Sequence, residues 1–182
     1  MFSFRINQTL ELRPISERDA EPMFVVVDRD REHLRRWLPW VDGTQSAEDS
    51  RAFCRDAVRQ SAANNGFHAG VWKDGNIVGV IGHHWIDWSN RRTSIGYWLS
   101  KSAEGRGIMT AACRAVVDYN FKSLDLNRIE IRCATENHRS RAIPHRLAFK
   151  LEGVIRQAEW LYDHFVDHEV YSMLKGEWEA GG

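Results

Sequence analysis

The chain has 182 residues, of which 43% are hydrophobic and 27% are charged, and its 25 basic and 25 acidic residues cancel to a formal net charge of zero. A chain of this length buries about 70% of its unfolded surface in one core, so residues 1–182 are expected to form a single domain. The cancelled charge gives no reason to expect direct nucleic-acid contact or binding to a membrane surface.

Signals for export, membrane insertion and disulfide formation are absent from the sequence. The N-terminal residues lack a long apolar segment followed by a small-residue cleavage site, and no run of about 18 apolar residues occurs. Cys54, Cys113 and Cys133 are widely spaced and form no CxxC pair, so neither a disulfide framework nor a zinc ribbon is expected. These features predict a cytoplasmic protein with reduced thiols.

The N-terminal half predicts a strand, two helices and an antiparallel meander. Ser16 and Ser46 precede acidic residues and are expected to cap helices, the second of which continues to Asn65. The pair Asp74-Gly75 is a strong signal for a hairpin turn between two strand-like runs. The strands expected in this half cover residues 10–15, 67–73, 77–86 and 93–99.

The C-terminal half predicts two helices and three strands. Apolar residues from Ile108 to Tyr119 recur at the spacing of one buried helix face. The other elements expected here are a strand over 128–135, a helix over 138–149 and closing strands over 153–161 and 165–174. Pro144 lacks an N–H group and restricts Ile143, which predicts that the second helix begins late or is kinked.

Two glycines, Gly105 and Gly107, lie directly in front of the helix that begins near Ile108. A helix N-terminus presents unpaired N–H groups, and glycines allow a phosphate to approach the backbone closely. A dinucleotide-binding fingerprint normally follows the first strand of a parallel βαβ unit, whereas this loop follows an antiparallel meander. A Walker loop would need a lysine that is missing here. The loop is therefore expected to hold a pyrophosphate, such as the one that coenzyme A carries.

Two long segments are similar to one enzyme family. The stretch YWLSKSAEGRGIMTAA (residues 97–112) resembles the acyl-CoA loop of GCN5-related N-acetyltransferases (GNATs), and residues 136–174 resemble their RimJ/RimL-like ribosomal-protein branch. The resemblance covers nearly the whole chain and implies an α/β (α+β) fold. It further implies a mixed, mostly antiparallel sheet of six or seven strands with helices on both faces, acetyl-CoA as cosubstrate, and no metal.

The same resemblance implies which residues bind the cofactor. Backbone groups of the last strand before the loop and N–H groups of the loop are expected to contact it, followed by an asparagine for the pantetheine arm and an arginine for the 3′-phosphate. These positions are Tyr97, Trp98 and Leu99, then Gly105, Arg106, Gly107 and Ile108, and finally Asn137 and Arg146. Glu104 and Met109 depart from the family's loop pattern.

Three residues are catalytic candidates on the basis of the resemblance. Ser140 is expected to protonate the leaving sulfur, because Pro144 occupies the position where many relatives carry a tyrosine. Cys133 is expected to face the cofactor thiol, and Glu159, on one strand face with Gln157, is the candidate base. The alternatives are a helix-terminal serine, a small buried cysteine and an ordinary surface glutamate.

Two further clusters carry weaker signals. His164 and His168 have acidic neighbours, but residues four apart on a strand are separated by about 13 Å, so no metal site is expected. Five arginines gather in one short region, where a solvated basic face is the alternative to a cofactor contact. They are Arg128, Arg132, Arg139, Arg141 and Arg146.

The predicted activity is transfer of an acetyl group from acetyl-CoA to an amine by direct attack in a ternary complex. The resemblance favours a protein N-terminal α-amine, for instance of a ribosomal protein. Acetylation of a small amine, such as a polyamine or an aminoglycoside, and a noncatalytic acyl-CoA sensor are the alternatives. The edge of the closing strand over 165–174 could pair with a second copy, which makes a homodimer conceivable.

Overall fold

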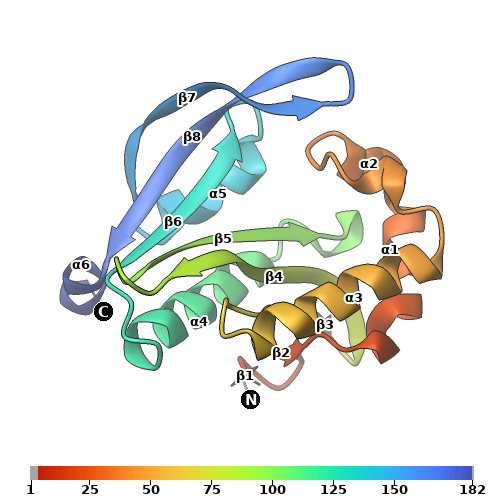
Figure 1. Cartoon of the computed structure of the whole chain (residues 1–182), viewed down its shortest axis with the longest axis horizontal. Coiled ribbons are helices and arrows are strands. Elements are labelled where there is room, and N and C mark those ends of the chain that lie inside the picture. The colour runs from red at the N-terminus through yellow and green to blue at the C-terminus, as the bar shows by residue number, and fades with distance from the viewer. Residues whose placement is uncertain (1–3, 182) are drawn as a thin grey trace.

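A single mixed sheet forms the centre of the computed structural model, which describes residues 4–181 (Figure 1). Residues 1–3 and 182, the ends of the expected single domain, lie outside the described residues. Within the described part, the sheet has eight strands in the order β1-β2-β3-β4-β5-β6-β8-β7. The strands are β1 (Phe4–Arg5), β2 (Leu10–Pro14), β3 (His68–Lys73), β4 (Asn76–Asp87), β5 (Arg92–Leu99), β6 (Arg128–Ala134), β7 (Lys150–Leu161) and β8 (His164–Leu174). The expected number was six or seven, and the additional strand is the two-residue β1. The expectation that residues 165–174 form a free sheet edge is wrong, because β8 pairs with β6 on one side and with β7 on the other, which leaves β7 as the edge strand.

Helices cover both faces of this sheet, as expected. One hydrophobic cluster joins Ile108 and Val116 of α4 to Ile81 of β4, and a second joins Met23 of α1 to the adjacent Val80. Because successive strand residues point to opposite faces, the two clusters lie on opposite sides of the sheet. The helices are α1 (Ala20–Arg29), α2 (Arg31–Arg35), α3 (Ala47–Ala62), α4 (Ile108–Lys122), α5 (His138–Arg146) and α6 (Lys175–Ala180). No helix among residues 4–181 is long and apolar enough to cross a membrane.

Strands β5 and β6 share only a short pairing and then separate. They are parallel neighbours, while all the other adjacent strands pair antiparallel. Their register runs from Arg92 opposite Arg128 to Ser94 opposite Glu130. Figure 1 shows the two strands diverging beyond this point. From Ile95 to Leu99, β5 therefore has a strand partner on its β4 side alone.

The hairpin turn at Asp74 and the helix cap at Ser46 are confirmed. Ser16 precedes a short 3-10 turn, Glu17–Asp19, and α1 begins only at Ala20 with Asp19 as its N-cap, so the prediction that Ser16 caps this helix is wrong. The amide of Asp49 donates to Ser46 Oγ at 3.3 Å, and the Asp49 carboxylate accepts from the Ser46 amide at 2.9 Å. Asp74 and Gly75 have φ angles of 49° and 78°, as a tight hairpin turn requires. Helix α3 ends at Ala62, before the predicted Asn65, because Asn64 has a φ of 54° that a right-handed helix does not allow.

Helix α5 begins earlier than Pro144 suggested. Its first residue is His138, because Asn137 caps it by accepting a hydrogen bond from the Ser140 amide at 3.2 Å. The expectation of a late start is therefore wrong, and Pro144 lies inside the helix. The helix ends at Arg146, before the predicted residue 149, and Ala148 just after it has a φ of 59°.

The closing hairpin of β7 and β8 carries a bulge that the sequence pattern did not indicate. Ile155 lies opposite His168 and Glu159 lies opposite Val166, so three residues on β7 correspond to one on β8. Gln157, inside the bulge, has a φ of 50°. The predicted alternation that places Gln157 and Glu159 on one regular strand face is therefore wrong.

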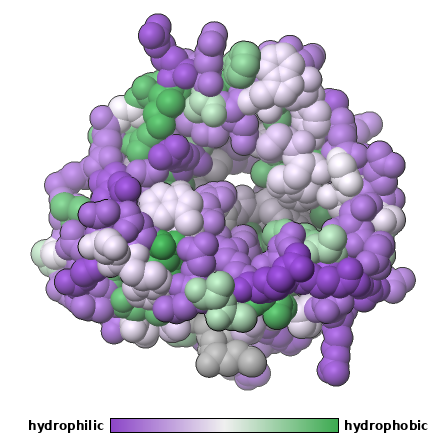
Figure 2. Space-filling view, in the orientation of Figure 1, coloured by the Kyte–Doolittle hydropathy of each residue, from purple (hydrophilic) through white to green (hydrophobic). Residues whose placement is uncertain are grey.

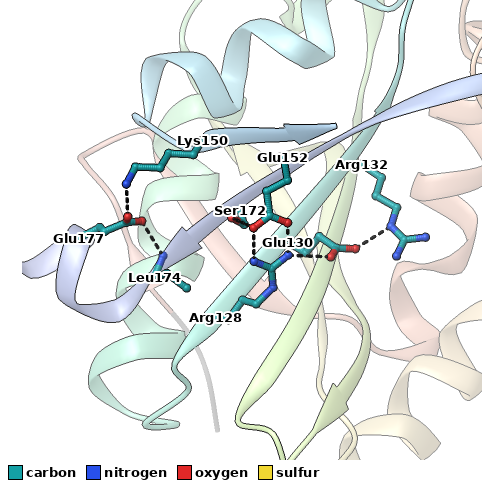
Figure 3. Close-up of polar contacts among 8 residues, drawn as sticks. All are labelled: Arg128, Glu130, Arg132, Lys150, Glu152, Ser172, Leu174 and Glu177. Atoms are coloured by element: carbon teal, nitrogen blue, oxygen red, sulfur yellow. Dashed lines mark hydrogen bonds and ion pairs between the residues drawn. The ribbon is translucent and has the colours of Figure 1, made fainter. Parts of the chain in front are cut away.

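Ion pairs tie the base of this hairpin to β6 and to the C-terminal helix (Figure 3). Arg128 on β6 reaches Glu152 on β7 at 2.5 Å, and Ser172 on β8 donates to the same carboxylate at 2.7 Å. The Arg128 guanidinium is the main reason that the pKa of Glu152 falls to about 2. Lys150 pairs with Glu177 of α6. The base of the hairpin is thus held firmly while its far end projects from the sheet.

A fully buried histidine joins β4 to α4. The Phe67 amide donates to His83 Nδ1 at 3.1 Å, so the ring proton lies on Nε2, which is 2.8 Å from Asn120 Oδ1. His83 is 0% exposed, and burial lowers its pKa to about 4. The folded protein therefore holds this imidazole in its neutral form.

We expect the free energy of unfolding to fall as the pH drops from about 6.5 to about 4. Over this range the unfolded chain binds a proton on His83 that the folded chain excludes, a difference of about 3 kcal/mol. Urea unfolding across this range should give a shallower pH slope for His83→Gln than for the wild type. The exposed control His138→Gln should keep the wild-type slope. An unchanged slope in His83→Gln would contradict the assignment.

Candidate active site

A cavity of about 1300 Å³ opens where β5 leaves β6. Three groups of residues line it: the end of β5, the loop before α4, and the first turns of α5. Residues from α2 and the segment after it complete the wall. Figure 2 shows a hollow near the centre of this face, in the region between β5 and the β7–β8 hairpin.

The glycine loop has the geometry of an anion-binding site. Gly105 and Gly107 both have a φ of 72°, and Gly107 is the N-cap of the long helix α4. A Cβ atom on either glycine would meet no atom within 4 Å, so the requirement for glycine is conformational. Gly105, Gly107 and Ile108 line the cavity, whereas Arg106 is exposed and does not. The unpaired N–H groups of the helix end are thus presented to the cavity.

The end of β5 sends side chains to both faces of the sheet. Tyr97 and Leu99 pack against the cluster that contains α4, while Trp98 packs against Leu34 and Val41 on the side of α2. All three predicted residues, Tyr97, Trp98 and Leu99, line the cavity. Because β6 has turned away here, one backbone edge of this segment faces the cavity rather than another strand.

Ser140, Cys133 and Tyr97 form one cluster. Cys133 Sγ lies 3.2 Å from Ser140 Oγ, and the Tyr97 hydroxyl lies 3.5 Å from the same oxygen. Burial raises the pKa of Cys133 and raises that of Tyr97 well above its usual value. All three groups therefore keep their protons at neutral pH, which suits proton donation rather than nucleophilic attack. Cys133 is 4% exposed and is not part of the cavity wall.

The Tyr97 hydroxyl has a role that the sequence analysis missed. Pro144 has no N–H group to donate to the Ser140 carbonyl, and Tyr97 donates to that carbonyl instead, at 3.2 Å. Sequence reasoning assigned Tyr97 a backbone contact alone. The available signal was Pro144 itself, because a buried carbonyl that loses its helical donor needs another one.

The predicted base lies apart from this cluster. Glu159 is on the projecting hairpin, its side chain is 33% exposed, and His168 Nε2 lies 3.6 Å from its carboxylate. It does not line the cavity. A residue that the sequence analysis did not consider, His84, faces the same region. Desolvation by the surrounding protein lowers the pKa of His84. The positive charge of Arg132 lowers this pKa further, and the negative charge of Glu159 raises it.

The arginines that are clustered in the sequence have different environments in the structure. Arg146 lines the cavity, with its guanidinium 3.5 Å from Thr110 Oγ1 on α4. Arg128 and Arg141 are instead paired with Glu152 and Glu169. No group of His, Cys, Asp or Glu residues that could hold a metal occurs among the described residues.

The amino-acid sequence is similar to those of known acetyltransferases. A family model described as an acetyltransferase (GNAT) domain matches residues 9–150. The putative ribosomal N-acetyltransferase YdaF of Bacillus subtilis (strain 168) is 39% identical over 183 residues, and the match covers 99% of each chain.

Comparison with solved structures gives the same family context. RimL, a ribosomal alpha-N-protein acetyltransferase in complex with coenzyme A, has a TM-score of 0.91 at 26% identity, covering 95% of this chain and 98% of that chain. The description of that complex records a disulfide between coenzyme A and a cysteine of RimL. MccE, a microcin self-immunity acetyltransferase in complex with acetyl-CoA and AMP, has a TM-score of 0.88 at 25% identity, covering 93% of this chain and 94% of that chain.

We expect Tyr97→Phe to lower the free energy of unfolding by about 1–3 kcal/mol, because it leaves the Ser140 carbonyl without a donor. Pro144→Ala restores an N–H group at the right place in the helix and should rescue Tyr97→Phe. Urea unfolding of the two single variants and the double variant measures the coupling. Independent, additive effects would show that the tyrosine and the proline are not linked through this carbonyl.

Proposed function

The chain belongs to the acetyltransferase (GNAT) family and is an acetyl-CoA-dependent enzyme, and we propose that its acceptor is the N-terminal α-amine of a protein, with ribosomal proteins as the first candidates. The observation that supports acetyl transfer at this site is one continuous cavity wall, which includes both the glycine loop and Ser140. The names of YdaF and RimL support a ribosomal acceptor.

The cavity supplies a contact for each part of acetyl-CoA. The N–H groups at Gly105, Arg106, Gly107 and Ile108 would hold the pyrophosphate, and Arg146 would meet the 3′-phosphate. The backbone edge of Tyr97, Trp98 and Leu99 would bind the pantetheine arm and the thioester carbonyl. Asn137 would orient the arm from the opposite wall. With these contacts the sulfur would lie near Ser140.

Ser140 would act as the general acid. The acceptor nitrogen would form a bond to the acetyl carbon, the carbon–sulfur bond would break, and the sulfur would take the Ser140 proton. Solvent would then return a proton to Ser140 and accept the amine proton from Glu159. Tyr97 and Cys133, which keep their own protons and lie within 3.5 Å and 3.2 Å of Ser140 Oγ, hold the hydroxyl in place. No covalent acyl-enzyme is required, which agrees with the raised pKa of Cys133.

Glu159, directly or through a water molecule, would remove the proton of the attacking amine. An α-amine has a pKa near 8, so a large fraction is already neutral at physiological pH and the demand on the base is modest. This suits a carboxylate that is partly exposed on a projecting hairpin. A lysine acceptor would need far more help.

A small amine is the second candidate acceptor. The structural match to MccE, which was solved with acetyl-CoA and AMP, favours it, because the same fold there serves a self-immunity acetyltransferase. A noncatalytic acyl-CoA sensor would keep the loop but would have no need for Ser140 or Glu159.

We further propose a cytoplasmic location and pairing of two copies through the exposed apolar side chains of the closing hairpin, Leu151, Val154, Trp160 and Phe165.

Intact-mass spectrometry tests the acceptor. Extracted ribosomal proteins, a polyamine panel and an aminoglycoside panel are incubated with the protein and acetyl-CoA while CoA release is followed. We expect a gain of one acetyl group on a protein N-terminus, located by peptide sequencing. Acetylation of a small amine alone would move the function to the second candidate.

We expect Ser140→Ala to lower kcat by about a hundredfold at all pH values, because the sulfur loses its proton donor. Glu159→Gln should lower kcat/KM by about tenfold near neutral pH, with the defect shrinking as the amine deprotonates above about pH 8. The exposed Ser102→Ala serves as the control and should behave as wild type. A pH-independent defect in Glu159→Gln would contradict its role as a base.

A further inference from the structure

Glu104, at the head of the glycine loop, connects three parts of the fold. Its carboxylate lies 2.9 Å from His33 Nε2 on α2 and also pairs with the guanidinium of Arg139 on α5. The Glu104 side chain is 18% exposed, and all three residues line the cavity. One carboxylate therefore links the cofactor loop to both walls of the cavity.

Helix α2 rests on the segment that carries the loop. The Lys101 amide, just before the loop, donates to the Asp30 carboxylate at 2.9 Å, directly before the first residue of α2. Trp98 of β5 packs against Leu34 of α2. The His33–Glu104 contact is thus the third attachment of α2 to this segment, and it is the one that ends on the loop itself.

The other end of α2 reaches the hairpin that carries Glu159. The Tyr162 hydroxyl, at the tip between β7 and β8, donates to the Leu38 carbonyl at 2.6 Å. The Arg35 guanidinium lies over the Tyr162 ring at 3.8 Å from its centroid. Figure 1 shows the hairpin tip extending to α2. A chain of contacts therefore runs from the cofactor loop through α2 to the hairpin.

The two partners of Glu104 differ in how they would respond to a bound phosphate. The side chain of Arg139 is 75% exposed, whereas that of His33 is 19% exposed. A guanidinium has five N–H donors and binds phosphate strongly, so phosphates at the loop would compete with Glu104 for Arg139. If Arg139 turned toward the phosphates, the Glu104 carboxylate would keep His33 as its remaining partner. Phosphate binding would then strengthen the attachment of α2.

We propose that Glu104 is a positioning residue that transmits occupancy of the cofactor loop, through His33 and α2, to the acceptor side of the cavity. The proposal rests on acetyl-CoA binding at the glycine loop, as in the proposed function, and requires no particular acceptor. Cofactor binding would order α2 and steady the hairpin tip, so the acceptor meets a completed site after the cofactor is in place.

Hydrogen–deuterium exchange with mass spectrometry tests this with CoA as the sole ligand. In the wild type we expect saturating CoA to slow amide exchange in the loop and, by about fivefold, in α2. In Glu104→Gln and in His33→Ala, CoA should slow exchange in the loop and leave α2 unchanged. In Arg139→Gln, α2 should exchange slowly even without CoA, because Glu104 has His33 as its sole partner from the start.

Glu32→Gln is the matched control. Glu32 lies on α2, is exposed and does not line the cavity, so the variant changes the same charge without touching the bridge or the cofactor site. It should respond to CoA as the wild type does. Equal protection of α2 by CoA in Glu104→Gln and the wild type would overturn the proposal, as would a wild-type α2 that does not respond.

Kinetics gives a second readout that a merely structural residue would not move selectively. With the acceptor found by mass spectrometry, Glu104→Gln should raise the acceptor KM by about tenfold and change kcat and the Kd of CoA by less than about threefold. A change confined to the Kd of CoA would overturn the proposal. A wild-type loop that CoA does not protect would instead refute the cofactor site, so the two failures are distinguishable.

Discussion

The separation of β5 from β6 beyond Ser94 is the constraint on which the rest of the structure depends. β6 pairs with β8 along its whole length on one edge, while its pairing with β5 on the other edge ends at Ser94 opposite Glu130. The backbone of β5 from Ile95 to Leu99 is left with an open edge inside the molecule, and buried backbone groups require partners. A ligand with amide groups of its own could pair with that edge, and the glycine loop and the start of α5 line the same cavity.

Around this opening, local departures from regular structure are matched by compensating contacts. Pro144 removes a helical donor, and Tyr97 replaces it from a different element. The bulge in β7 interrupts the ladder, yet the amide of Gln157 donates to the Asp167 carboxylate at 2.7 Å. Each compensation fixes the position of a side chain near the cavity: Tyr97 beside Ser140, and Glu159 on the far side of the bulge. In both places a side chain from another element or strand supplies the hydrogen-bond partner that the regular ladder lacks.

Local chemistry explains which parts of the fold could be predicted from the sequence. The cap at Ser46 and the turn at Asp74 depend on residues a few positions apart, and both were predicted from the sequence. The cap at Asn137 was not predicted, because Pro144 pointed to a later start of that helix. The bulge at Gln157 was not visible, because its residues alternate like those of a regular strand. The contact between Glu104 and His33 joins residues 71 positions apart, and no local pattern encodes it. Of the candidate site, the loop and Ser140 were predictable, while the partners that position them were not.

The distribution of ion pairs explains how a chain with no net charge could bind a cofactor that carries several negative charges. Most arginines away from the cavity are matched with carboxylates, as Arg128 is with Glu152 and Arg141 with Glu169. Arg146, on the cavity wall, has no carboxylate within ion-pair distance in the described part of the chain. Its charge adds to the partial positive charge of the α4 N-terminus. A phosphate in the cavity would thus be attracted by this unpaired guanidinium and the helix terminus rather than by the net charge of the chain, which is zero.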